Sequence, residues 1–266
     1  MNEARSISHA ATNATMFELV TSQDLSKLAV VDVGAGEGHF CRKLGEYVQG
    51  TYGLPPARIL RACDLFPDQF KYEAIRCDPA DINDRLPYPD RAFDIVCSIE
   101  VIEHLENQFA FTRELYRICR EDGRVLITTP NILNIGSRLS YFYAGFWSLF
   151  RPLPIETRDP VHVSGHINPV SFYYLAYMLR KAGFQEVRLH FDRLKKSGCT
   201  LTLFFYPLIR LPHLVYLKRL ALKRPEIYLQ NAAILRQMNT WRMLASRTVI
   251  VEGLKRDANA RTDPFT

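Results

Sequence analysis

Short apolar runs alternate with amphipathic segments between Leu28 and Gly183, and this alternation constrains the fold more than any other feature of the sequence. The runs have the length of buried strands, and the segments between them have the 3.6-residue period of helices. Strands that are buried on both faces and joined by helices form a mostly parallel sheet with helices on both sides. We therefore predict an α/β domain over residues 28–194.

The positions of the elements follow from the same pattern. Seven strands are expected, at Ala29–Val33, Ile59–Cys63, Ala74–Cys77, Phe93–Ile99, Arg124–Thr129, Glu186–Phe191 and Thr248–Leu254. Helices are expected at His39–Val48, Gln108–Cys119 and Pro169–Ala182, and the turn at Gly123 is a plausible stop for the second. Residues 1–27 are read as a helical or flexible segment, 247–256 as the last strand of the domain and 257–266 as a tail.

Two segments depart from the alternation. Residues 131–168 form a long connection rich in aromatic side chains, which is typical of a lid or a substrate-binding element. Residues 195–246 read as a helical insertion, interrupted at Pro207, Pro212 and Pro225. No stretch is expected to reach the ~18 apolar residues of a membrane-spanning helix. The nearest, Leu139–Phe150 and Ser197–Ile209, are too short.

Charge and cysteine usage constrain the function only weakly. A formal net charge of +6 over 266 residues suits a nucleic acid, an anionic lipid or an acidic substrate, but is also ordinary for a solvated surface. The six cysteines have no CxxC pair and no metal-finger spacing, which favours reduced thiols. The first 20 residues lack the apolar run of a signal peptide. We therefore expect a cytoplasmic protein.

A glycine-rich turn follows the first predicted strand. The run VVDVGAGEG, from Val30 to Gly38, places glycines at 34, 36 and 38. Such a turn lets a ligand approach the backbone, and the helix that follows offers free N–H groups to an anion. The spacing is not the GxGxxG of dinucleotide-binding proteins, and a carboxylate at Asp32 would repel a pyrophosphate. A cofactor other than a dinucleotide is indicated.

The run DVGAGEG, an acidic end to the second strand and then LPYPDRAFDIV resemble, in order and spacing, the motifs of class I S-adenosylmethionine-dependent methyltransferases. The resemblance covers about Leu28 to Phe191 and the last strand. It implies a Rossmann-like seven-stranded sheet and S-adenosylmethionine as cofactor.

By this resemblance, particular residues would bind each part of the cofactor. The methionine part would be held by Asp32, by the backbone of Gly34, Ala35, Gly36 and Gly38, and by the backbone of Ser98 and Ile99. Asp64 would accept hydrogen bonds from the ribose hydroxyls. Asp81 with Ile82 would meet the adenine, and Asp78 competes with Asp81 for that role.

The string Glu100-Val101-Ile102-Glu103-His104 follows the fourth strand, where the substrate pocket of this fold opens. If it forms a helical turn, Glu100, Glu103 and His104 share one face. The string resembles that of ubiquinone-pathway O-methyltransferases and small-RNA ribose methyltransferases, in which two glutamates, this histidine and a later one gather a divalent metal. His166 is the first choice for the later histidine and His162 the second.

Two mechanisms therefore stay open. Two carboxylates and two imidazoles suit Mn²⁺ or Zn²⁺ better than Mg²⁺. Without a metal, His104 or His166 becomes the catalytic base, because imidazole titrates near neutral pH.

The expected reaction is transfer of a methyl group from S-adenosylmethionine to an oxygen of a small-molecule, glycan or lipid-linked acceptor. The segment Thr129-Pro130-Asn131 with its following polar residues resembles methyltransferases of glycans and lipids. An RNA or other nucleic-acid methyltransferase, and a non-catalytic cofactor-binding subunit, are the alternatives. The basic, apolar run from Ile209 to Arg224 predicts a further contact, with a partner or with the inner face of a membrane.

Overall fold

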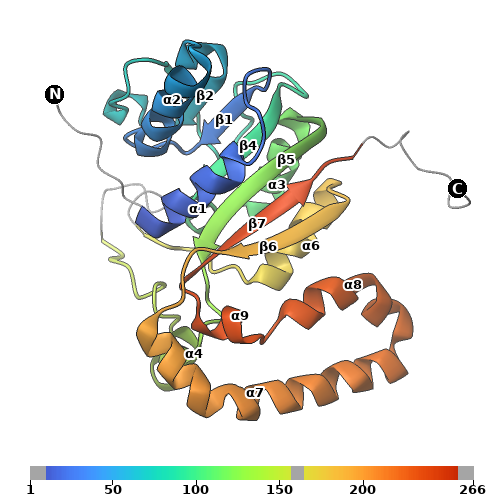
Figure 1. The fold of residues 1–266 in the computed structure, drawn as a ribbon. Coiled ribbons are helices and arrows are strands. Elements are labelled where there is room, and N and C mark those ends of the chain that lie inside the picture. Colours follow the sequence, from blue (N-terminus) through green and yellow to red (C-terminus); the bar gives the residue numbers. More distant parts are fainter. Residues whose placement is uncertain (1–9, 157–164, 257–266) are drawn as a thin grey trace, which may run out of the picture.

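The computed structural model describes residues 10–156 and 165–256, and these fold around one seven-stranded sheet (Figure 1). The strands are β1 (Val30–Val33), β2 (Leu60–Asp64), β3 (Cys77–Pro79), β4 (Phe93–Ile99), β5 (Cys119–Pro130), β6 (Glu186–Phe191) and β7 (Thr248–Leu254). Their order is β3-β2-β1-β4-β5-β7-β6, and β7 pairs antiparallel with both neighbours. The predicted seven-stranded, mostly parallel sheet is confirmed.

Helices cover both faces of the sheet. One layer contains α1 (Ala10–Thr21) and α2 (His39–Tyr52), and the other contains α3 (Gln108–Ile118) and α6 (Phe172–Ala182). Side chains alternate along each strand, so in β1 Val30 packs with α1 and α2 while Val31 and Val33 pack with α3 and α6. Short 3-10 turns, η1 (Pro56–Arg58), η2 (Pro67–Gln69) and η3 (Ile102–His104), complete this part.

Two predicted boundaries were wrong. The third strand is not Ala74–Cys77: residues 73–75 form a turn that still buries Ile75, and only Cys77–Pro79 pair with β2. The fifth strand does not begin at Arg124 after a turn at Gly123, because the chain is already extended at Cys119, which pairs with Phe93 of β4. In the first place a buried apolar side chain was mistaken for part of a strand, and in the second the charged residues 120–122 were mistaken for a turn.

The long connections both lie at the carboxyl edge of the parallel strands. One leaves β5 and forms α4 (Ile135–Ala144). The other leaves β6 and forms α7 (Lys196–Lys223), α8 (Pro225–Gln237) and α9 (Trp241–Ala245) before β7 begins. Its two ends are joined by a bridge between Leu194 and Ser246 and by the N–H of Lys195, which donates to the carbonyl of Ala245 at 3.0 Å.

Helix α7 differs from its prediction. It runs for 28 residues through Pro207 and Pro212, and among the described helices it alone is long and apolar enough, by length and composition, to cross a membrane. The expectation that no segment reaches that length was therefore wrong. Each proline removes one backbone hydrogen bond, but both rings are exposed and displace no core packing. Contacts with α4, α8 and α9 stabilise the helix on either side of them.

Candidate active site

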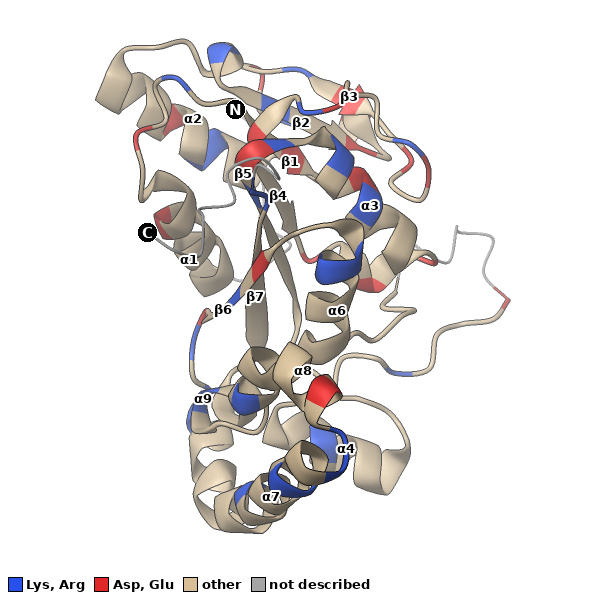
Figure 2. Ribbon diagram, turned by 90° about the vertical axis from the view of Figure 1, so that its right-hand side faces the viewer, with Lys and Arg blue, Asp and Glu red and all other residues tan. Residues whose placement is uncertain are grey.

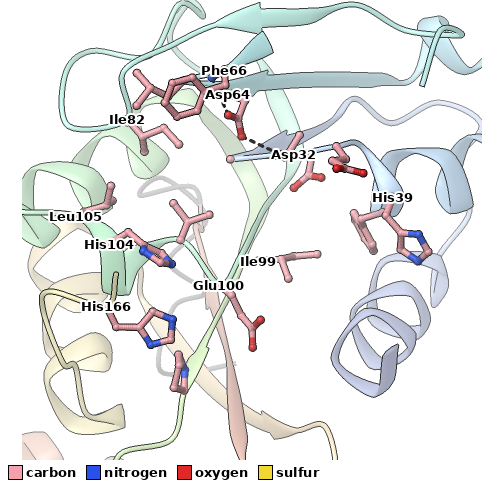
Figure 3. Close-up of a pocket in the computed structure, with 18 of the residues that line it drawn as sticks. Asp32, His39, Asp64, Phe66, Ile82, Ile99, Glu100, His104, Leu105 and His166 are labelled. Atoms are coloured by element: carbon pink, nitrogen blue, oxygen red, sulfur yellow. Dashed lines mark hydrogen bonds between the residues drawn. The ribbon is translucent and has the colours of Figure 1, made fainter. Parts of the chain in front are cut away.

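A cavity of about 560 Å³ opens at the carboxyl ends of β1, β2 and β4 (Figure 3). This is the point where the strand order reverses, since β2 lies on one side of β1 and β4 on the other, and ligands of open α/β sheets bind at such points. Its walls come from the β1–α2 turn, the segments after β2 and β3, the chain from the end of β4 through η3, and Gly165 with His166.

The turn after β1 depends on glycine. Gly34, Gly36 and Gly38 have φ of 80°, 52° and 83°, a left-handed conformation that is costly for other residues. A Cβ at Gly34 would lie 2.4 Å from a methyl carbon of Val101. The backbone therefore passes close to the cavity wall and begins α2 with its N-terminus at the cavity.

Asp64 holds this turn to the end of β2. One carboxylate oxygen accepts from the N–H of Gly36 at 2.8 Å, and the other accepts from the N–H of Phe66 at 2.9 Å (Figure 3). The carboxylate is thus fixed at the cavity before any ligand binds.

The structure separates the two aspartates that competed for the adenine. Asp81 lines the cavity beside Ile82, and its carboxylate accepts from the N–H of Asn83 at 2.9 Å. Asp78 instead faces a second cavity and lies 3.5 Å from the guanidinium of Arg76. Only Asp81 is brought to the predicted place.

Asp32 lines the cavity and is almost fully buried. One of its oxygens accepts from the thiol of Cys41 at 3.4 Å, and the other has no hydrogen-bond partner. Burial, reinforced by the nearby charge of Asp64, raises the pKa of Asp32 to about 7. A buried, half-satisfied carboxyl group of this kind is suited to pairing with a cationic ligand group.

Two of the predicted backbone contacts do not line the cavity. Gly38 is the residue before α2, and a Cβ there would meet the ring of Phe70 at 2.6 Å. Ser98 is fully buried, and Ile99 after it reaches the cavity. Gly34, Ala35 and Gly36 line the cavity as expected.

Glu100 does not share a helical face with Glu103 and His104, so that prediction was wrong. Its φ is 54°, and its N–H donates to the hydroxyl of Thr128 at 2.9 Å, so η3 begins only at Ile102. The Glu100 side chain points away from His104 in Figure 3. Burial raises its pKa, and the charge of Arg247 opposes that rise.

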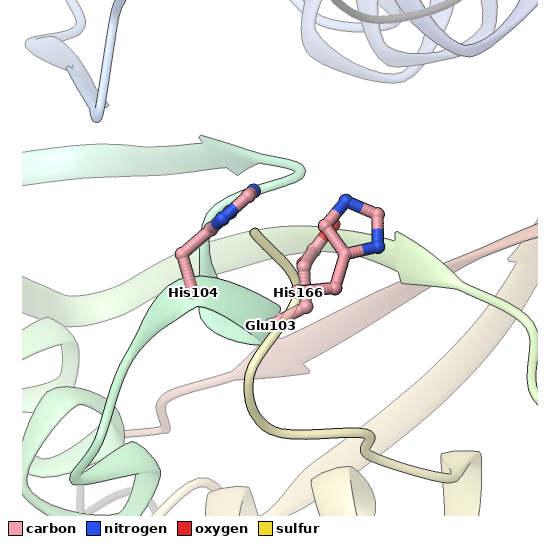
Figure 4. A group of neighbouring side chains, drawn as sticks. All are labelled: Glu103, His104 and His166. Carbon is pink, nitrogen blue, oxygen red and sulfur yellow. The ribbon is translucent and has the colours of Figure 1, made fainter. Parts of the chain in front are cut away.

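Glu103, His104 and His166 do converge (Figure 4). Their ligand atoms lie within 4.8 Å of one another, and Glu100 is not part of this group. Glu103 is fully buried, neither carboxylate oxygen has a hydrogen-bond partner, and burial raises its pKa to about 8. Burial also lowers the pKa of both histidines, which favours neutral imidazoles at pH 7.

Backbone hydrogen bonds bring His166 to this place. The N–H groups of Ile167 and Asn168 both donate to the carbonyl of Glu103 at 3.0 Å. Nδ1 of His104 lies 2.9 Å from the carbonyl of Gly165, which assigns the proton to Nδ1 and leaves Nε2 as the acceptor. His162, the second choice, lies outside the described residues.

Several lining residues were not predicted from the sequence. His39, Phe66, Leu149 and Arg247 all reach the cavity. Phe66 could have been found, because it follows the second strand at the edge where ligands bind. Arg247 carried no such signal, because the whole insertion separates it from the other site residues.

The family model described as "Methyltransferase domain" matches residues 9–189. With the fold and the cavity described above, this shows that the chain belongs to the class I S-adenosylmethionine-dependent methyltransferase family. S-adenosylmethionine is the cofactor of that family, and the glycine turn, Asp32 and Asp64 fit it.

Two curated relatives illustrate the range of the family. Ajmaline N-methyltransferase of Rauvolfia serpentina is 29% identical over 167 residues, 53% of this chain and 57% of that protein. The chloroplastic tocopherol O-methyltransferase of Arabidopsis thaliana is 35% identical over 107 residues, 38% of this chain and 29% of that protein. The chain thus matches little more than half of the first relative's length and less than a third of the second's.

A solved S-adenosylmethionine-dependent methyltransferase from Archaeoglobus fulgidus has the same fold. Its TM-score is 0.55 at 16% identity, and the match covers 91% of this chain and 92% of that one. The fold of this chain is therefore a known architecture.

Proposed function

We propose that this chain transfers a methyl group from S-adenosylmethionine to an oxygen of a small-molecule, glycan or lipid-linked acceptor. One observation carries the proposal: a single cavity has the glycine turn and Asp64 on one wall and a pair of half-buried imidazoles, His104 and His166, on another. The names of the two relatives include one O-methyltransferase and one N-methyltransferase, so the choice of oxygen rests on the imidazole pair.

The cofactor half would bind by groups that are already in place. The Asp64 carboxylate would accept from the ribose hydroxyls, and Asp81 with Ile82 would hold the adenine. Asp32 would pair with the cationic amino group, and the backbone of Gly34, Ala35 and Gly36, with Ile99, would enclose the methionine part. When bound, S-adenosylmethionine supplies an electrophilic methyl group on a sulfonium.

The acceptor half would position a hydroxyl and remove its proton. His104 is suited to this task because Nε2 is free to accept while Nδ1 donates to the Gly165 carbonyl. His166 packs edge-on against it, with ring centroids 4.9 Å apart, and restricts its orientation. His104 is the last residue of η3, and His166 lies in the segment before α6.

A divalent metal at Glu103, His104 and His166 is the alternative that we propose for the same half. The buried Glu103 carboxylate, which has no hydrogen-bond partner, favours it, because such a group costs free energy unless a cation or proton satisfies it. One carboxylate and two imidazoles suit Mn²⁺ or Zn²⁺. The bound metal would supply a Lewis acid to the acceptor oxygen. Glu100 is no longer a proposed ligand.

Binding of Mn²⁺ to the isolated protein tests this alternative without a turnover assay. Calorimetry should give a site in the parent that is lost in Glu103→Gln, and Glu100→Gln is the matched control that should bind normally. Equal binding by the parent and Glu103→Gln, or none by either, rejects the metal.

Turnover with labelled S-adenosylmethionine tests the proposed reaction. Pools of quinols, glycans, lipids and RNA would be compared, each with and without chelator. Label in a hydroxylated small or lipid-linked acceptor supports the proposal. Label in RNA, with binding that falls steeply as salt rises, would favour the nucleic-acid alternative. Cofactor binding without transfer to any pool would favour a non-catalytic subunit.

We propose a cytoplasmic location, which the six free thiols support.

A further inference from the structure

Helix α7 presents an apolar face away from the protein. Seven large apolar side chains along it are exposed, by 44 to 75%: Leu203, Phe204, Leu208, Leu211, Leu214, Val215 and Leu222. Their spacing of three or four residues places them on one side of the helix. A surface helix of a soluble domain normally turns its polar side outward.

The polar side chains in the middle of α7 lie on the inner side. A guanidinium nitrogen of Arg210 donates to the carbonyl of Met238 at 3.2 Å, and Nε2 of His213 lies 3.2 Å from the carbonyl of Leu235. At its start the helix is packed tightly on α9, since a Cβ at Gly198 would meet the carbonyl oxygen of Ala245 at 2.9 Å. The apolar face is therefore held outward by the fold, and α7 lies across the lower end of the molecule in Figure 1, below α4, α9 and α8.

The surface around the apolar face is basic. Residues 195–246 contain nine Lys and Arg side chains and one acid, Glu226. Lys218, Arg219 and Lys223 are exposed in the last turns of α7. Figure 2 shows basic residues along this helix. If a second copy of the chain bound this face, the basic side chains of the two copies would lie close to one another, with few acidic side chains to pair with them. Anionic lipid headgroups would instead neutralise these charges.

Helix α4 extends the apolar surface toward the cavity. It contacts α7 and leaves the rings of Phe142 and Tyr143 exposed by 89% and 76%. The segment after it supplies Leu149 to the cavity wall. Exposed aromatic rings of this kind are suited to the interface between lipid headgroups and acyl chains.

We propose that the outward face of α7, together with α4, docks on an anionic membrane surface, with α7 lying in the plane of the headgroups. Apolar side chains enter the acyl boundary while Lys218, Arg219 and Lys223 meet the phosphates. This docking does not depend on the proposed reaction. Docking would also present a lipid-linked acceptor to the cavity, and this second role rests on the proposed function.

Flotation of the full chain with vesicles tests the docking. Vesicles of phosphatidylcholine alone would be compared with vesicles that also contain phosphatidylserine. We expect the parent to bind the anionic vesicles more strongly. Phe204→Glu with Leu208→Glu should reduce the partition coefficient roughly tenfold or more. Each substitution removes apolar area that the membrane would bury, and adds a negative charge. Lys218→Glu with Lys223→Glu should also reduce it and remove the preference for phosphatidylserine.

Tyr174→Glu is the matched control, since Tyr174 is 62% exposed on α6, outside the proposed face, and its variant should bind like the parent. Calorimetric affinity for S-adenosylmethionine should be unchanged in every variant, which separates loss of docking from loss of fold or of the proposed function. Unchanged partition in the α7 variants overturns the proposal. A parent dimer that dissociates in the Phe204→Glu, Leu208→Glu variant also overturns it, because the face would then bind a second copy.

Discussion

The two halves of the cavity are built differently. In the cofactor half, the Asp64 carboxylate is held by two backbone N–H groups and the glycine turn is fixed by the strands beside it. In the acceptor half, Glu103 is fully buried and its carboxylate has no partner. An unsatisfied buried polar group costs about 1 to 3 kcal/mol. The difference indicates that the sheet preforms the cofactor half except at one oxygen of Asp32, whereas both oxygens of Glu103 in the acceptor half await a ligand or a proton.

Loss of the His104 imidazole should have the largest effect. We expect His104→Ala to reduce kcat roughly 10²- to 10⁴-fold, because it removes a group that holds or deprotonates the acceptor. Its affinity for S-adenosylmethionine should stay within about twofold of the parent. Calorimetry and single-turnover rates would be measured together. If the turnover rate and the affinity for S-adenosylmethionine fall by the same factor, the two halves of the cavity do not act separately.

Replacement of Asp32 sharpens the comparison within the cofactor half. Because burial raises the folded-state pKa of Asp32 from 3.8 to about 7, the native state keeps a proton that the unfolded chain has lost. The stability of the cofactor-free protein should therefore fall as pH rises from about 4 to 7 and then level off. The Asp32→Asn variant has no carboxyl group to titrate at this position. It should therefore be more stable than the parent at pH 8, by up to about 4 kcal/mol.

Cofactor affinity should respond to Asp32 in the opposite direction. The ionised carboxylate pairs with the cationic amino group, so the parent's affinity should rise as pH increases through 7, and the Asp32→Asn variant should bind weakly with a flat profile. Urea unfolding and calorimetry over the same pH range provide both measurements. Parallel pH profiles for parent and variant would show that Asp32 is not the titrating group.

The smallest effect is expected where one polar contact is removed at the cavity edge. Asp64→Ala and Asp81→Ala should weaken S-adenosylmethionine binding roughly tenfold or more, since a hydrogen bond to a charged group contributes about 1.5 to 3 kcal/mol. Asp78→Ala is the control and should bind normally, because Asp78 faces the other cavity. Normal binding by both Asp64→Ala and Asp81→Ala would remove these residues from the cofactor site.

The sequence predicted the cofactor half better than the acceptor half, for a physical reason. Asp32 and Asp64 lie at the ends of β1 and β2, and Asp81 follows β3. The sheet register brings these strand ends together, so order along the chain translates into proximity. Glu100 depends on a single backbone angle. Its left-handed φ moved it off the face that the helical spacing predicted, and no residue type in the string signals that change.

Distance along the chain explains the other differences. His166 was expected beside His104, but nothing in the sequence specified the carbonyl of Glu103 that holds its segment. The prolines of α7 were read as breaks, because the sequence does not show that neighbouring helices support the helix through them.

The bridge between Leu194 and Ser246 also explains why the sheet tolerates so large an insertion. Its two ends already lie side by side, so folding must only close a loop of residues 195–245. Closure entropy grows with the logarithm of loop length, so a loop of roughly fifty residues costs only about 2 kcal/mol more than a tight turn of about six. A short turn joining β6 to β7 would therefore preserve the strand register, but it would also remove Ile234 and Met243, which pack in the core beneath the insertion. Closing the insertion costs little entropy, whereas losing it would open the core.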